Sequence, residues 1–167
     1  FCMTAQQHVA GPHPARLHSV QRHRIVAHIR RGDVSKVSHP TKWLPNAYYL
    51  EQISHHKRND SEVIVFSESK SDEPFDVFIQ LGYEVRLDST CEEVWRYAID
   101  SEVFIMSRSS FSYVPALLSS GKVVYHAFWH QPLRDWVIGE SSRVRGKQHS
   151  ALYNRHKKPT CSKCSQV

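Results

Sequence analysis

From residue 24 onward, short runs rich in β-branched and aromatic residues alternate with longer amphipathic stretches. This alternation is typical of parallel strands joined by crossover helices. The expected strands span residues 24–30, 62–68, 83–88, 102–107 and 122–128. The expected helices span residues 46–57, 72–81, 91–99 and 115–120. Because such connections wind almost always right-handed, the sequence predicts an α/β fold with a Rossmann-like, doubly wound parallel sheet.

Local signals mark where the expected helices begin and end. Asn46 and Asp72 suit helix N-caps, because their side chains accept hydrogen bonds from the first backbone N–H groups of a helix. Gly82 and Gly121 suit C-terminal stops, since glycine readily adopts the left-handed conformation that ends many helices.

The chain divides into three expected regions. Residues 1–23 lack apolar periodicity and are expected to form an irregular lead-in, residues 24–138 a Rossmann-like domain, and residues 139–167 a basic, flexible tail. Lys and Arg outnumber Asp and Glu by 22 to 16, which favours anionic partners. No apolar run reaches the roughly 18 residues that a membrane span needs, so we expect no membrane segment in this chain.

Four cysteines, at positions 2, 91, 161 and 164, make a poor disulfide framework for a chain of this length. Cys161 and Cys164 have the spacing of a zinc knuckle, and His156 lies nearby. A structural zinc site needs four ligands, and the sequence has no second closely spaced cysteine pair. We therefore expect a solvated tail and no metal.

The first candidate site follows the first expected strand. His28 and Arg30 are two residues apart, so their side chains point to the same face of the sheet near the carboxyl end of the strand. Arg31, Gly32 and Asp33 then form a sharp exit turn. A planar guanidinium matches phosphate oxygens in a bidentate way. Two other interpretations are an Arg30–Asp33 pair that only braces the turn, and an adhesion tripeptide at residues 31–33, which would need a mobile exposed loop.

The second candidate site is the run Ser109, Ser110, Phe111 and Ser112, which follows the expected strand 102–107. Pro115 lacks an N–H and is tolerated in a first helical turn, so we expect the helix to begin at about Ser112. The serines would then lie at a helix N-terminus, which attracts pyrophosphate through unpaired N–H groups and the helix dipole. The alternative is an ordinary serine cap that serves only the helix.

Together, a cationic strand end and a serine-rich helix start indicate a nucleotide diphosphate between them. The chain has neither a Gly-x-Gly-x-x-Gly run nor a Walker-type loop, so a dinucleotide enzyme or an ATPase is disfavoured. Five aromatic and histidine side chains lie at or after the end of the last expected strand: His126, Phe128, Trp129, His130 and Trp136. They could line a sugar or base pocket, although core packing is the favoured role for most of them.

These motifs resemble those of a known enzyme superfamily. Residues 28–33, His-Ile-Arg-Arg-Gly-Asp, are similar to the His-x-Arg-Arg-Gly-Asp signature of α1,2-fucosyltransferases and to related motifs in α1,6- and protein O-fucosyltransferases. Residues 103–112 resemble the Ser-Ser-Phe-Ser motif of the same superfamily, and residues 63–68 its intervening Phe-Ser-Asp motif. Order and spacing agree, and the resemblance covers roughly residues 24–138.

The resemblance implies one half of a GT-B fold, the carboxyl-terminal half that binds GDP-fucose. It implies inverting, metal-independent transfer of fucose to a glycan or glycoconjugate acceptor, with no cofactor beyond the donor substrate. Arg30 would hold the β-phosphate and stabilise the leaving group, and Glu92 or Glu93 is the nearest candidate for the acidic residue that contacts guanine. Independently of the resemblance, we expect Asp33 to orient Arg30 or Arg31. The implied donor-binding residues are His28, Arg30, Arg31, Gly32, Ser67, Glu93, Ser109, Ser110, Phe111 and Ser112.

The resemblance also raises two questions of context. A GT-B enzyme has a second Rossmann-like domain, for which residues 1–23 leave no room, so we expect either a fragment of a longer enzyme or a reduced protein. Eukaryotic members typically work in the secretory pathway or Golgi behind an amino-terminal anchor. The alternatives are a non-catalytic nucleotide-sugar-binding protein, or a nucleic-acid-binding module permitted by the pI near 9.3. No nucleic acid is expected as a partner, because no recognised reading motif is present.

Overall fold

The computed structural model describes residues 23–139 of the 167-residue chain. The lead-in expected over residues 1–23 falls outside them apart from its last residue, and the tail expected over 139–167 falls outside apart from its first. Cys161 and Cys164 also lie outside the described residues.

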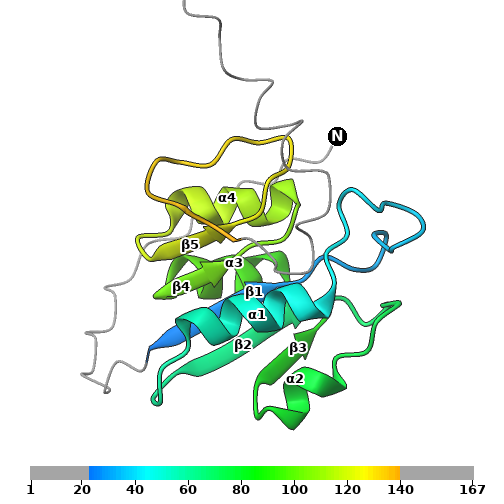
Figure 1. Ribbon diagram of the computed structural model, residues 1–167, viewed down its shortest axis with the longest axis horizontal. Helices are drawn as coiled ribbons and strands as arrows, with labels where there is room; N and C mark the ends of the chain where they lie inside the picture. The colour runs from blue at the N-terminus through cyan, green and yellow to red at the C-terminus, as the bar shows by residue number, and fades with distance from the viewer. Residues whose placement is uncertain (1–22, 140–167) are drawn as a thin grey trace, which may run out of the picture.

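Six strands form one fully parallel sheet in the order β3-β2-β1-β4-β5-β6 (Figure 1). The strands are β1 Arg24–His28, β2 Glu62–Ser67, β3 Glu84–Leu87, β4 Val103–Ile105, β5 Lys122–Tyr125 and β6 Val137–Ile138. This order defines a doubly wound sheet whose direction of winding reverses between β1 and β4. The predicted α/β, Rossmann-like fold class is therefore confirmed.

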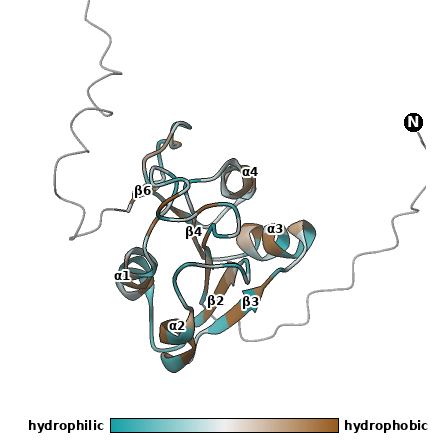
Figure 2. Ribbon diagram, turned by 90° about the vertical axis from the view of Figure 1, so that its right-hand side faces the viewer, coloured by the Kyte–Doolittle hydropathy of each residue, from teal (hydrophilic) through white to brown (hydrophobic). Residues whose placement is uncertain are grey.

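Four helices cover the two faces of the sheet, as the view along the strands shows (Figure 2). They are α1 Asn46–His56, α2 Asp76–Gln80, α3 Cys91–Ile99 and α4 Ser110–Leu118. One face packs against α1 and α2, and its core includes Ile53 and Phe78. The other face packs against α3 and α4, through Val94 and Ala116 among others. No described helix has both the length and the apolar character required to cross a membrane.

The central strand β1 is apolar on both sides because both of its faces are covered. Ile25 and Ala27 belong to the core under α1 and α2, whereas Val26 belongs to the core under α3 and α4. All three side chains are inaccessible to solvent. A continuous apolar run is what a strand in the middle of a parallel sheet requires.

Helix α2 begins at Asp76, so the prediction that it starts at Asp72 was wrong. Glu73 precedes Pro74, and the residue before a proline is sterically biased away from the helical conformation. The Glu73 carboxylate instead accepts a hydrogen bond from the backbone N–H of Asn46 at 2.7 Å. The segment before α2 therefore holds the start of α1 in place.

Helix α4 also begins earlier than predicted, at Ser110 rather than at about Ser112. Ser109 is the N-cap: its backbone is extended, and its hydroxyl accepts a hydrogen bond from the Phe111 N–H at 3.2 Å. Pro115 consequently lies inside the helix and not in its first turn. Pro115 is buried, and its missing N–H removes the helical bond to the Phe111 carbonyl.

The other boundary signals had mixed outcomes. Helix α1 starts at Asn46, but the N-cap is Pro45, because the Asn46 side chain bonds elsewhere. Gly82 ends α2 with φ +76°, as predicted. Gly121 does not adopt a positive φ. It is required instead for space, since a Cβ there would lie 2.1 Å from the Ser101 carbonyl oxygen.

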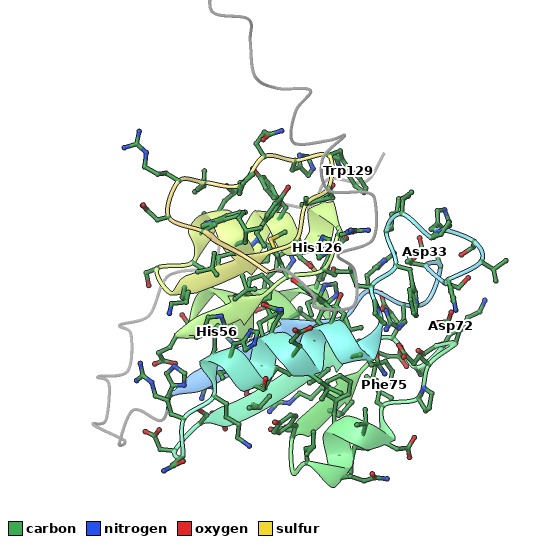
Figure 3. All side chains as sticks on the ribbon, viewed as in Figure 1. Asp33, His56, Asp72, Phe75, His126 and Trp129 are labelled. Carbon is green, nitrogen blue, oxygen red and sulfur yellow. The ribbon has the colours of Figure 1, made fainter. Side chains whose placement is uncertain are left out.

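Strands β1, β2 and β3 each end one or two residues earlier than predicted. Arg30, Glu68 and Asp88 therefore lie just beyond the strands, at the carboxyl edge of the sheet. Strand β6 was not predicted; it pairs with β5 through two residues only. Figure 3 labels Asp33 and Trp129 on the carboxyl side of the sheet and His56 on the opposite side.

Candidate functional site

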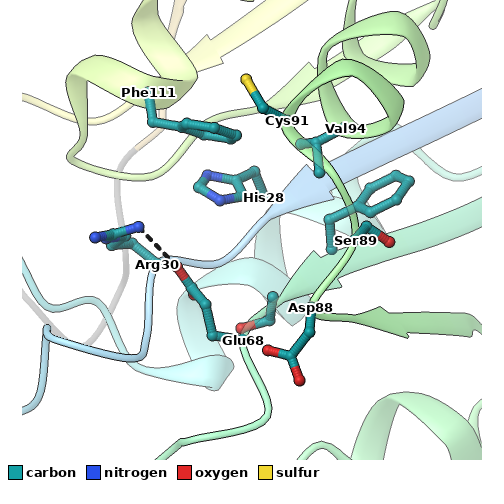
Figure 4. Close-up of a pocket in the computed structure, with 10 residues that line it drawn as sticks. His28, Arg30, Glu68, Asp88, Ser89, Cys91, Val94 and Phe111 are labelled. Carbon is teal, nitrogen blue, oxygen red and sulfur yellow. Dashed lines mark hydrogen bonds and ion pairs between the residues drawn. The ribbon is translucent and has the colours of Figure 1, made fainter.

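A pocket of about 130 Å³ opens at the carboxyl edge of β1 and β2, beside the start of α3. Ten residues line it: His28, Arg30, Phe66, Ser67, Glu68, Asp88, Ser89, Cys91, Val94 and Phe111 (Figure 4). It adjoins the point between β1 and β4 where the winding of the sheet reverses. Ligands of doubly wound proteins bind at this edge. Residues of the first and second candidate sites, more than 80 positions apart, thus meet in one pocket.

His28 forms the floor of the pocket and is held by two buried serines. Its Nδ1 lies 2.6 Å from Ser112 Oγ and 3.1 Å from Ser107 Oγ, and those two hydroxyls lie 2.8 Å apart. The Phe111 ring packs on the imidazole with 4.9 Å between ring centroids. Burial, helped by the charge of Arg30, lowers the pKa of His28 to about 3. His28 is therefore a neutral imidazole at physiological pH, and its Nε2 makes no hydrogen bond to any residue in 23–139.

Arg30 lies at the mouth of the pocket, fixed between two carboxylates. Its Nη1 donates to Glu68 Oε1 at 2.7 Å (Figure 4). Its Nη2 donates to Asp33 Oδ1 at 2.5 Å. The second oxygen of Glu68 accepts from the Arg31 backbone N–H. Asp33 thus does contact Arg30, as predicted. The guanidinium is pre-oriented, but two carboxylates already compensate its charge.

Arg31 lies on the opposite face of the sheet and is fully buried. Its Nη2 donates to Asn46 Oδ1 at 2.7 Å and to the Leu44 carbonyl at 3.0 Å, and it pairs with Glu73 at 3.2 Å. The side chain does not reach the pocket. Arg31, which was predicted to bind the donor, instead links the turn after β1 to the start of α1 and to the segment before α2.

The serine run has several separate contacts. Ser109 caps α4, and Ser112 hydrogen-bonds to His28 from below the pocket. The Ser110 hydroxyl lies 3.0 Å from His130 Nε2, in the loop between β5 and β6. Phe111 is the member of the run that lines the pocket. The Phe111 N–H donates to Ser109 Oγ at 3.2 Å and the Ser112 N–H to the Ser109 carbonyl at 3.1 Å, so the cap already uses two N–H groups that the sequence assigned to pyrophosphate.

Three predicted donor-binding residues remain, Ser67, Gly32 and Glu93, and each has a role within the fold. Ser67 lines the pocket, but its hydroxyl donates to the Ile29 carbonyl at 2.7 Å. Gly32 has φ +69°, so it makes the sharp turn after β1. The Glu93 carboxylate pairs with Arg86 at 2.8 Å and does not line the pocket, so the register that placed it against guanine is not supported by its position.

Sequence reasoning missed several lining residues that come from β2, β3 and α3. Glu68 and Asp88 directly follow β2 and β3, and Cys91 and Val94 lie in the first turns of α3. The rule that ligands bind at carboxyl strand ends would have identified the two carboxylates, because both stand at predicted strand ends. The side chains that line the pocket therefore include one arginine and two carboxylates.

The fold and the pocket define a Rossmann-like α/β domain with a polar site at the carboxyl edge of its sheet. No group of three or more potential metal ligands occurs within residues 23–139. Comparison with protein-family models, with curated proteins and with solved structures found no match.

Proposed function

We propose that this chain is the donor-binding half of a fucosyltransferase-like glycosyltransferase of the GT-B type. One observation carries the proposal: His28 and Arg30 from the first motif and Phe111 from the second line a single pocket. The resemblance rests on three separate segments, and the sheet brings them to one edge. That edge is where doubly wound folds bind nucleotides.

In this proposal the donor is GDP-fucose, and the chemistry is inverting transfer to a glycan acceptor. The acceptor hydroxyl oxygen bonds to the anomeric carbon, the bond from that carbon to the β-phosphate oxygen breaks, GDP leaves with the electron pair, and the hydroxyl proton passes to water. Fixed cations and N–H donors stabilise the charge that develops on the leaving phosphate. Arg30 supplies such donors at the mouth of the pocket.

The pocket carboxylates and His28 suit the nucleoside part of such a donor. The neutral His28 offers Nε2 to a hydroxyl or an N–H group of the ligand, and the pKa of about 3 keeps the imidazole uncharged during the reaction. Asp88 is exposed at the rim, where its pKa is lowered by hydrogen bonds from Ser69, so it stays an acceptor. Phe111 offers an apolar wall.

Calorimetric titration of the full chain with GDP, GDP-fucose, ADP and UDP tests the proposal. We expect selective binding of the two guanine nucleotides and at least about a tenfold loss of affinity in Arg30→Ala, because charge-assisted hydrogen bonds to phosphate are lost. Arg58→Ala is the matched control, since Arg58 is exposed and remote from the pocket. Equal binding of all three diphosphates, or no binding to a folded chain, would contradict the proposal.

Turnover is measured separately, as release of GDP from GDP-fucose in the presence of mixed glycan acceptors. Release that Arg30→Ala reduces supports a transferase. Guanine-selective binding without release identifies the alternative, a non-catalytic nucleotide-sugar-binding protein.

A further inference from the structure

A second cationic site lies at the carboxyl edge, on the α1 side of the pocket. Ala27 of β1 pairs with Ile105 of β4, and Arg30 and Arg108 each lie three residues beyond that pair. The two arginines thus leave neighbouring strands at the same level. Arg108 stands where the loop between β1 and α1 meets the loop between β5 and β6, because it contacts Thr41 of the first loop and His126 of the second.

The Arg108 guanidinium is held in a fixed orientation by neutral groups. Its Nη1 donates to the Thr41 carbonyl at 2.7 Å, and its Nε donates to His126 Nδ1 at 3.1 Å. Burial lowers the pKa of Arg108, although the phenolic oxygens of nearby tyrosines oppose this effect. The side chain keeps its charge, because an arginine remains protonated in proteins.

No carboxylate in the described part of the chain pairs with Arg108. The ion pairs formed there involve Arg24, Arg30, Arg31 and Arg86. Arg30, the cation of the pocket, is shared between Glu68 and Asp33. A partly buried charge without a counterion is costly unless a ligand supplies one.

A second uncompensated cation lies beside Arg108. Lys42 follows Thr41 directly, is partly buried, and forms no ion pair within residues 23–139. Its Nζ lies 5.5 Å from the centre of the Trp129 ring, which brings it against the loop that contains His126. Lys42 therefore directly follows the residue whose carbonyl orients Arg108, which itself lies between β4 and α4.

We propose that Arg108, supported by Lys42, binds a phosphoryl oxyanion at the carboxyl edge of the sheet. This inference rests on the proposed function in one respect: it takes the oxyanion to be a phosphate of the nucleotide-sugar donor. Arginine presents several N–H donors in a planar fork, and two acceptors of the protein already fix that fork. The pocket lined by Glu68 and Asp88 then receives the uncharged part of the donor, and the phosphates extend toward Arg108.

Titration with inorganic pyrophosphate, GMP and GDP at low salt tests this site in the full chain. We expect Arg108→Gln to weaken pyrophosphate and GDP binding at least about tenfold and GMP binding less, because a charged hydrogen-bonding partner of phosphate is removed. Lys42→Gln should weaken both by a smaller factor. Arg134→Gln is the control, since it removes the same charge from an exposed position in the loop between β5 and β6.

The outcomes separate this inference from the proposed function. If pyrophosphate binds through Arg108 but GDP binds no more tightly than pyrophosphate, the oxyanion site stands and the nucleotide proposal fails. If GDP binds and depends on Arg30 while Arg108→Gln and Lys42→Gln stay within about twofold of the parent chain, the inference is overturned and the proposed function stands. If neither ligand binds, both fail. If Arg108→Gln lowers the urea midpoint of unfolding, Arg108→Lys is tested instead, because it keeps the positive charge but lacks the planar guanidinium.

Discussion

His28 is a histidine that the fold keeps uncharged. Two serine hydroxyls occupy its Nδ1, the Phe111 ring covers it, and Arg30 lies nearby. The folded-state pKa of about 3 lies below the ordinary value of 6.5. As the pH falls from 6.5 to 3, the unfolded chain binds a proton that the folded chain does not. The folded state therefore loses stability over this window and holds its full stability above pH 6.5.

A pH series of urea unfolding measures this effect. Between about pH 7.5 and pH 4.5 we expect the unfolding free energy of the parent chain to fall by roughly 2–3 kcal/mol more than that of His28→Gln. Glutamine keeps a polar partner for Ser112 but does not titrate. His55→Gln is the control, because His55 is an exposed histidine on α1. Parallel pH profiles of the parent chain and His28→Gln would show that His28 does not resist protonation.

The adjacent Arg30 and Arg31 show how much of the site a sequence can reveal. Strand alternation correctly separates His28 and Arg30 from Arg31, because side chains two apart share a face. The partners of each arginine could not be predicted, since Glu68, Asn46 and Glu73 reach them only through the packing of distant segments. For the same reason the sequence identified Phe111 and Arg30, which line the pocket, but missed Asp88.

The junction between α4 and β5 depends on a glycine for space. A Cβ at Gly121 would lie 2.1 Å from the Ser101 carbonyl oxygen and 2.9 Å from that of Glu102. These oxygens belong to the backbone next to β4 and cannot move without disturbing the sheet. At Gly82 the constraint is different, because φ is +76° and a Cβ there would have no other atom within 4 Å.

The two glycines therefore predict different responses to alanine. Gly82→Ala should cost about 1 kcal/mol, the penalty of a left-handed alanine. Gly121→Ala should cost about 3 kcal/mol or more, because a backbone overlap has to be relieved. Urea midpoints of the two variants measure the difference. Equal losses would mean that the junction accommodates a side chain by a small shift.

Elements that carry their own sequence pattern were predicted well. Helix α3 was placed correctly at both ends, and the five longer strands were all located, because hydrophobic runs and punctuation residues define them. The starts of α2 and α4 were misplaced, since Glu73 and Ser109 take roles that depend on contacts outside the element. Strand β6 has two residues, Val137 and Ile138, too few for any periodicity to indicate a strand.

Across the whole molecule, the protection of backbone amides against hydrogen exchange should fall from the centre of the sheet to its edges. Strand β1 pairs on both sides and is buried on both faces, whereas β3 and β6 each pair on one side. We expect β1 amides to exchange only on global unfolding and β6 amides at least about 100-fold faster. Hydrogen exchange followed by mass spectrometry of peptides resolves the two strands. Equal protection in β1 and β6 would imply that additional contacts secure the β6 edge.

The position of β1 also has a consequence for synthesis. Strand β1, the first to be made among those in residues 23–139, lies inside the finished sheet, and its partner β4 follows β2 by 36 positions, from Ser67 to Val103. At about 5–20 residues per second, a ribosome takes roughly 2–7 s to supply that partner. During this interval the β4-facing edge of an apolar strand has no neighbour of its own chain. The nascent protein is then most vulnerable to pairing with a second nascent chain, and a chaperone acting there would most improve its yield.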